Sequence, residues 1–94
     1  MLPLNYAILR LFLDTEEADT EAVMDALAEH YHNFRQFTHT SVTEALMTAE
    51  ANGLLEQTRY ELDSGQHLHV YYRATEAGRS MIERYIHPPA KLAP

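Results

Sequence analysis

Histidine has the richest chemistry of any residue type in this chain, because imidazole binds metal ions and exchanges protons near neutral pH. Six histidines occur among 94 residues. His67 and His69 would lie on one face of an extended strand, about 7 Å apart, with Glu61 as the one acidic third ligand that the pattern offers. His30 and His32, two residues apart on a helix, would point in different directions. Structural or surface histidines explain this pattern better than a metal site, so we expect neither a metal nor a cofactor.

Motifs of common enzyme classes do not occur in the sequence. It contains no G-x-S-x-G, no P-loop, no dinucleotide-binding fingerprint and no H-E-x-x-H. Three glycines in the whole chain leave little material for a loop that cradles phosphate. The sequence therefore predicts a binding protein and not an enzyme.

Charge limits what the protein can bind. Fourteen acidic residues against six arginines and one lysine give a formal charge of −7. This balance disfavours indiscriminate binding to nucleic acid or to anionic lipid. Most of the positive charge lies in the second half of the chain, on these four arginines: Arg59, Arg73, Arg79 and Arg84. Attraction for a polyanion would have to come from that half or from a second subunit.

The N-terminal stretch MLPLNYAILRLFL predicts a buried helix. It lacks a basic leader, is interrupted by Asn5 and Arg10, and is shorter than the ~20 residues that span a bilayer. With no cysteine in the chain, we expect a cytoplasmic protein that does not contact membranes. The helix is apolar on more than one side, which predicts a homodimer. The candidate interface residues are Tyr6, Leu9 and Leu13 of this helix and Tyr85 and Ile86 near the C-terminus.

Two further amphipathic helices follow. Thr15, Asp19 or Thr20 could cap the first of them, which would end near residue 32. For the next helix we expect Thr40 or Ser41 as the cap and Asn52-Gly53 as the end, because glycine accepts a positive φ. A last helix would begin after Thr75, carry an apolar stripe through residues 81–86 and end at Pro88-Pro89.

Between the last two helices, the side-chain pattern changes to the alternation of strands. Glu56 to Leu62 and His67 to Ala74 flank DSGQ and predict a β-hairpin. We expect Tyr60 to lie opposite Leu68 on the core side, with a three-residue loop from Asp63 to Gly65. The outer face would then carry these residues: Arg59, Glu61, His67, His69, Tyr71 and Arg73.

The order of elements predicts the fold class. Three helices, a two-stranded hairpin and a fourth helix (α-α-α-β-β-α) form a mostly α domain with the winged helix-turn-helix plan. We expect a single winged-helix domain over residues 1–88 and a frayed tail over residues 89–94.

The second half of the chain, roughly residues 40–86, resembles PadR-type and, more loosely, MarR-type winged-helix regulators. In these families a helix ends in E-x-x-G-L-I, a wing follows, and Y-Y-x-x-T-x-x-G opens the next helix. The matching positions are Glu50, Gly53, Leu54, Leu55, Tyr71, Tyr72, Thr75 and Gly78. The resemblance implies a winged-helix fold and a role in transcription regulation.

Binding of double-stranded DNA is the first of two functions compatible with this plan. The third helix would meet base edges and the hairpin would meet phosphates. The stretch from Thr38 to Glu56 has three glutamates and no lysine or arginine, but short polar side chains can read bases and glutamate can accept from cytosine N4. The candidate DNA-binding residues are Ser41, Thr43, Glu44, Met47, Thr48, Arg59, His69 and Arg73.

Binding of another protein is the alternative. PadR-like recognition helices commonly carry a tyrosine near the start and basic residues in the middle, where this chain has Thr43, Met47 and Thr48. Methionine and alanine flanked by acidic residues suit a protein groove better than a phosphate backbone. In this case the chain would be an acidic winged-helix module without intrinsic DNA binding.

Overall fold

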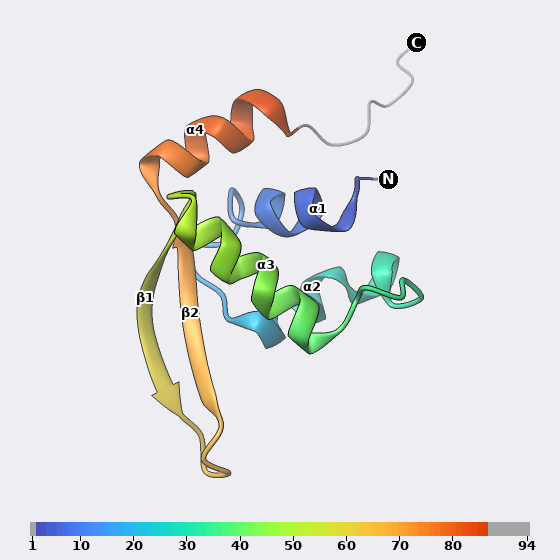
Figure 1. Ribbon diagram of the computed structural model, residues 1–94, viewed down its shortest axis with the longest axis vertical. Coiled ribbons are helices and arrows are strands. Elements are labelled where there is room, and N and C mark those ends of the chain that lie inside the picture. Colours follow the sequence, from blue (N-terminus) through green and yellow to red (C-terminus); the bar gives the residue numbers. More distant parts are fainter. Residues whose placement is uncertain (1, 87–94) are drawn as a thin grey trace.

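Four helices and one β-hairpin make up residues 2–86, the part of the chain that the computed structural model describes. The elements are α1 (Leu4–Leu11), α2 (Thr20–Tyr31), α3 (His39–Ala51), β1 (Leu55–Leu62), β2 (Leu68–Ala74) and α4 (Glu76–Tyr85). Their order confirms the predicted winged helix-turn-helix fold (Figure 1). Within the described residues, no helix combines the length and hydrophobicity needed to cross a bilayer. The expected domain end at residue 88 and the tail over residues 89–94 lie outside the described part.

Hydrophobic side chains from both ends of the chain meet in one core. The largest fully buried side chains are Ile8, Phe12, Val23, Val42, Leu46, Leu55 and Ile82. In α3, Val42, Leu46 and Ala49 are buried at the three-to-four spacing of one helix face. The opposite face of α3 is therefore left at the surface, and Gly53, with φ of 79°, ends the helix as expected.

Side chains cap three of the four helices. Asp19 accepts a hydrogen bond from the backbone of α2, and Thr75 does so for α4 as predicted. The cap of α3 is Thr38, whose hydroxyl accepts from the Ser41 N–H at 3.1 Å. The expectation of Thr40 or Ser41 is therefore wrong, because the helix already begins at His39 and both residues lie inside its first turn.

The hairpin forms the wing, but its register differs from the prediction. Tyr60 lies opposite Val70 and Leu62 opposite Leu68, so the predicted pair of Tyr60 with Leu68 is wrong. These residues do share one face, yet Tyr60 is 72% exposed and Leu62 61%. The expected core side is also wrong for this part of the wing, because the hairpin extends beyond the helices that could cover it (Figure 1).

Two irregularities account for the register. The loop holds five residues, 63–67, instead of three, and within it Gln66 adopts a positive φ of 66°. Near the base of the wing, the pairing shifts by one residue between Gln57 and Arg59. Such a bulge moves one extra residue into a strand and reverses which side chains share a face beyond it.

The segment before α2 holds the base of the wing. Ala18 and Tyr72 exchange two backbone hydrogen bonds, each 2.9 Å, which place Ala18 beside β2 like a short third strand. Two residues later, the hydroxyl groups of Thr20 and Thr43 lie 2.8 Å apart and link α2 to α3. Residues 18–20 thus connect the wing to the helix pair and position both.

Candidate functional site

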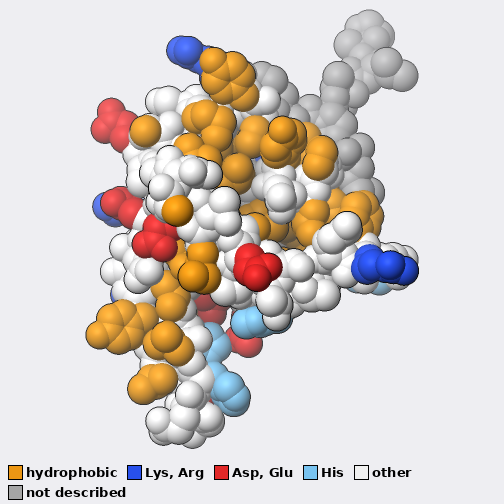
Figure 2. Space-filling model, in the orientation of Figure 1, with side chains coloured by type: hydrophobic (Ala, Val, Ile, Leu, Met, Phe, Trp, Pro, Cys, Tyr) orange, Lys and Arg blue, Asp and Glu red, His pale blue; other side chains and the backbone are white. Residues whose placement is uncertain are grey.

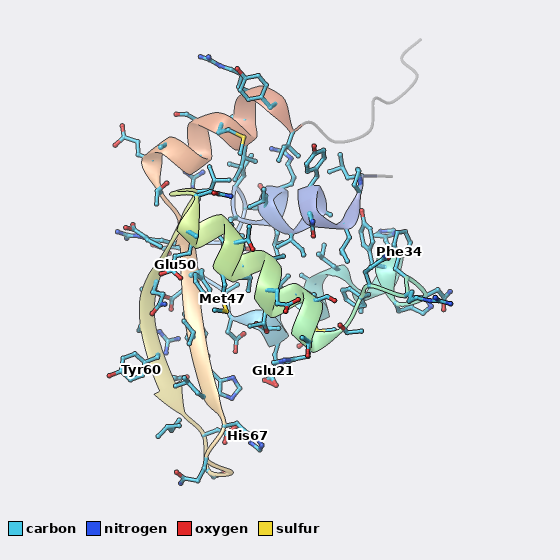
Figure 3. All side chains as sticks on the ribbon, viewed as in Figure 1. Glu21, Phe34, Met47, Glu50, Tyr60 and His67 are labelled. Carbon is cyan, nitrogen blue, oxygen red and sulfur yellow. The ribbon has the colours of Figure 1, made fainter. Side chains whose placement is uncertain are left out.

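The exposed face of α3 forms a ridge between two hollows. Glu44, Met47 and Thr48 are exposed on this ridge, and Met47 retains 55% of its accessible surface. A hollow of about 400 Å³ separates the ridge from α1, and one of about 530 Å³ separates it from the wing. Met47 and Glu50 point from α3 towards the wing (Figure 3). The ridge has the shape that a helix needs to enter a groove in a partner.

Ser41 and Thr43, near the start of α3, are only half-exposed. Ser41 lines the hollow on the α1 side. Thr43 lines the hollow on the wing side, and its hydroxyl is engaged with that of Thr20. The structure thus places the two candidates on opposite flanks of α3.

Arg59 contacts groups of its own wing and of the segment before α2, with 46% of its side chain still exposed. Its Nε lies 2.8 Å from Glu17 Oε1 and its Nη1 2.8 Å from Glu61 Oε2. The guanidinium also stacks over the Tyr71 ring, 3.8 Å from the ring centroid. Hydrogen bonds from Thr58 and Arg59 hold the pKa of Glu17 below its ordinary value. A phosphate would have to compete with two carboxylates for this arginine.

Among residues 2–86, Arg73 has one acidic partner. Its Nε lies 2.7 Å from Glu56 Oε2, and both side chains are about half-exposed. Exposed ion pairs of this kind are weak, so the pair can open at little cost. Arg73 is therefore more available to a polyanion than Arg59.

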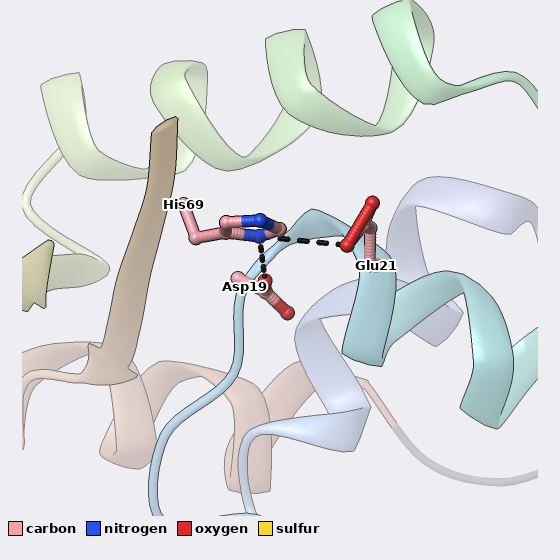
Figure 4. Close-up of side chains that lie close together, drawn as sticks. All are labelled: Asp19, Glu21 and His69. Carbon is pink, nitrogen blue, oxygen red and sulfur yellow. Dashed lines mark hydrogen bonds and ion pairs between the residues drawn. The ribbon is translucent and has the colours of Figure 1, made fainter. Parts of the chain in front are cut away.

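His69 faces the start of α2 instead of the solvent. Its Nδ1 lies 2.9 Å from Asp19 Oδ2 and 3.4 Å from Glu21 Oε1 (Figure 4), while its Nε2 lies 2.9 Å from Asp63 Oδ2. Only 18% of the side chain is exposed. The hydrogen bond with Asp63, and next that with Asp19, raises the pKa of His69 to about 9. The histidine expected to contact DNA is thus held inside the protein's own carboxylate cluster.

Arg35 is a functional candidate that the sequence analysis did not select. It is exposed in the turn between α2 and α3, four residues before α3 begins. Within residues 2–86 it forms no ion pair, in contrast to Arg59 and Arg73. The sequence signal was available, since the surrounding NFRQF segment contains no acidic residue.

The candidate dimer residues divide between surface and core. Tyr6 of α1 is 50% exposed and Tyr85 of α4 is 69% exposed, while Leu9 and Leu13 are half-buried. Ile86 is only 4% exposed, so it packs within its own chain and offers no surface to a partner. Figure 2 shows apolar side chains gathered over the end of the molecule where α1 and α4 lie, and again along the wing.

Comparison with protein families gives a match over most of the chain. Residues 8–84 match the family described as transcriptional regulator PadR-like family. The chain belongs to the PadR-like family. The match extends well upstream of residues 40–86, on which the sequence resemblance rested, and includes α2, α3, the wing and most of α4. PadR-like proteins are a family of transcriptional regulators and not of enzymes.

Solved structures of PadR-like proteins share this fold. Bacillus subtilis PadR, crystallised in complex with operator DNA, superimposes with a TM-score of 0.71 at 20% identity, over 96% of this chain and 51% of its own. A PadR-like transcriptional regulator from Bacillus cereus gives a TM-score of 0.64 at 23% identity, over 86% of this chain and 75% of its own. The present chain thus spans about half the length of the Bacillus subtilis protein. No curated protein sequence matches significantly.

Proposed function

We propose that this PadR-like chain is a cytoplasmic transcriptional regulator that binds double-stranded DNA. The observation that carries the proposal is the family match over residues 8–84, because these residues include the helix-turn-helix and the wing. A related protein of the same fold, Bacillus subtilis PadR, was crystallised with operator DNA. In winged-helix and helix-turn-helix proteins, the second helix of the motif enters the major groove, and here that helix is α3.

The ridge of α3 supplies the groups that would meet base edges. Glu44 and Thr48 are exposed there, beside the half-exposed Ser41. Carboxylates accept hydrogen bonds from cytosine N4, and hydroxyl groups pair with several bases. Met47 adds an apolar contact surface suited to the methyl group of thymine. These contacts would give sequence preference but little affinity.

Affinity would depend on a small number of arginines around α3. Arg35 precedes α3 and has no acidic partner among the described residues, so it is the foremost phosphate ligand. Arg73 and Arg59 on the wing would exchange their glutamates for phosphates. Because each exchange breaks an existing ion pair, the wing should contribute less to the affinity for DNA than its number of arginines suggests.

A homodimer through α1 and α4 would double this small positive charge. Tyr6 and Tyr85 leave apolar surface exposed on two helices that pack against each other. A two-fold dimer places two recognition helices on half-sites one helical turn, about 34 Å, apart. Dimerisation would thus compensate for the weak binding that an acidic monomer can achieve.

Arg35→Ala tests the proposal most selectively. Fluorescence anisotropy with a labelled mixed-sequence duplex should show about tenfold weaker binding, as expected for loss of a charged hydrogen bond. The salt dependence should fall by about one unit of slope. Arg84→Ala, at the end of α4, removes the same charge and serves as the matched control. Equal effects of the two substitutions would contradict a role of the α2–α3 turn in DNA binding.

An exposed apolar strip on the wing favours protein binding as a second candidate function. Tyr60, Leu62 and Leu68 are all more than half-exposed on one face of the hairpin. A Leu62→Ser substitution would weaken a protein complex through loss of apolar contact area. The same substitution would leave the phosphate contacts of Arg35 and Arg73 in place, so unchanged DNA binding would separate the two functions.

A further inference from the structure

Three side chains from two distant parts of the chain converge at the base of the wing. Asp19 is the N-cap of α2, Glu21 belongs to its first turn, and His69 comes from β2, fifty residues after Asp19. One ligand atom from each lies within 4.8 Å of the other two. Figure 4 shows both carboxylates directed at the same nitrogen, Nδ1 of His69.

A fourth side chain orients the imidazole. Asp63, in the wing loop, lies 2.9 Å from Nε2, the nitrogen on the other side of the ring. When Nδ1 binds a metal ion, the proton of the neutral ring lies on Nε2, where Asp63 is placed to accept it. Metal-binding histidines characteristically donate their second N–H to a carboxylate in this way.

We propose that Asp19, Glu21 and His69 bind one divalent transition-metal ion of the zinc class, with Asp63 positioning the histidine. One imidazole nitrogen and two carboxylate oxygens form a ligand set typical of sites that complete their coordination with water. Mg²⁺ and Ca²⁺ are disfavoured, because these hard ions prefer oxygen ligands throughout.

The two distances from His69 to its carboxylate neighbours agree with such a site. Ligand atoms bound at 2.0–2.2 Å around a tetrahedral or octahedral ion lie about 3 to 3.5 Å apart. Nδ1 of His69 is already 2.9 Å from Asp19 and 3.4 Å from Glu21. Glu21 is well exposed and can adjust its position, whereas Asp19 is nearly buried and fixed by its capping bond to Ala22.

The surroundings also suit a cation. The three ligands line a hollow of about 320 Å³, whose wall contains the further acidic residues Asp25 and Glu61. This hollow provides room for water molecules at the open coordination positions. The negative charge around it raises the local concentration of cations.

Protons compete with the metal for His69. When the ion is absent, the hydrogen bond with Asp63, and next that with Asp19, favours the imidazolium and raises the pKa of His69 to about 9. Metal binding must therefore release a proton from His69, and the apparent affinity should rise as the pH is raised from 6 to 8. The ion would replace one bridging proton between β2 and α2 and hold the wing base with coordination bonds.

Isothermal titration with ZnCl₂ tests the site on the tag-free chain, independently of any DNA. We expect one ion per chain and at least tenfold weaker binding after His69→Gln or Glu21→Gln. Asp19→Asn removes the charge of that ligand but keeps the helix cap, because asparagine caps as well as aspartate. Asp63→Asn should weaken binding about 10- to 100-fold without changing the stoichiometry.

His30→Gln and His32→Gln are the matched controls, since both histidines are exposed at the far end of α2 and contact none of the four residues of the site. They should change the zinc affinity less than twofold. Circular dichroism of each variant verifies that the fold is retained. Unchanged zinc binding by His69→Gln, or no binding by the folded wild type at 100 µM zinc, would overturn the proposal, whatever the DNA assays show.

Discussion

Replacing Gly78 with alanine should destabilise the protein, although alanine is the better helix former. Gly78 lies in the first turn of α4, where an added Cβ atom would be 1.9 Å from the carbonyl oxygen of Leu54 and 2.7 Å from its carbonyl carbon. Cβ contacts shorter than 3.0 Å essentially do not occur. The obstacle is backbone and cannot rotate away, so α4 must shift by about 1 Å in a close-packed interior.

That shift would break the junction between α4 and the end of α3. Thr75 donates its N–H to Leu54 O at 3.0 Å and its hydroxyl to Gly53 O at 2.7 Å. Losing both hydrogen bonds costs about 2 kcal/mol, and overpacking adds about 1–3 kcal/mol. Alanine returns about 1 kcal/mol through its helix propensity. The expected net loss in the free energy of unfolding is about 3 kcal/mol, or a Tm lower by about 12–24 °C for a domain of this size.

Urea unfolding monitored by far-UV circular dichroism measures this loss. Gly53→Ala is the matched control, because Gly53 has a positive φ but no atom within 4 Å of an added Cβ. Gly53→Ala should lower the free energy of unfolding only by the cost of placing alanine at a positive φ, about 1–2 kcal/mol. If Gly78→Ala proved as stable as the wild type, or more stable than Gly53→Ala, the close approach of α4 to Leu54 would be wrong.

Three further predictions concern charge and assembly. Because the pKa of His69 is raised to about 9 in the fold, its protonated form stabilises the metal-free protein fully below pH 6.5, and this stabilisation should disappear as the pH rises through about 9. Urea unfolding midpoints measured in EDTA should therefore fall between these pH values for the wild type and stay constant for His69→Gln. Glu56→Gln frees Arg73 from its ion pair, so anisotropy titrations should show tighter DNA binding and a steeper salt dependence, and weaker binding would count against a phosphate contact by this arginine. Leu9→Glu should convert a dimer into a monomer, as measured by sedimentation. If the wild type itself sedimented as a 10.8 kDa species at micromolar concentration, dimerisation through α1 would be wrong.

Local signals in the sequence were sufficient to predict the helices and their ends. Thr75 and Gly53 can be identified from the sequence because a helix N-cap and a positive φ at a helix end each depend on the residue type at one position. The register of the hairpin was not predictable in the same way. Alternation assumes an uninterrupted strand, and the shift between Gln57 and Arg59 together with the five-residue loop breaks that assumption without leaving a distinct pattern.

The electrostatics of the candidate site depend on contacts between distant residues. Glu17 and Arg59 are 42 residues apart, and Asp19 and His69 are 50 apart. Alternation placed Arg59 and His69 correctly on the face away from Tyr60, but it carried no information about what covers that face. The covering segment is the start of α2, held there by the backbone pairing of Ala18.

Titrating mixed-sequence duplex DNA with the wild-type protein at increasing salt tests the proposed function most directly. Three phosphate contacts per chain, from Arg35, Arg59 and Arg73, should make the logarithm of the association constant fall linearly with the logarithm of salt concentration. The slope should be about −2.7 for each bound chain, or about −5.4 for a dimer with both chains on the duplex. Binding should be detectable at about 50 mM salt with tens of micromolar protein. No binding under these conditions, or a slope near zero, would contradict recognition of DNA by α3 and the wing.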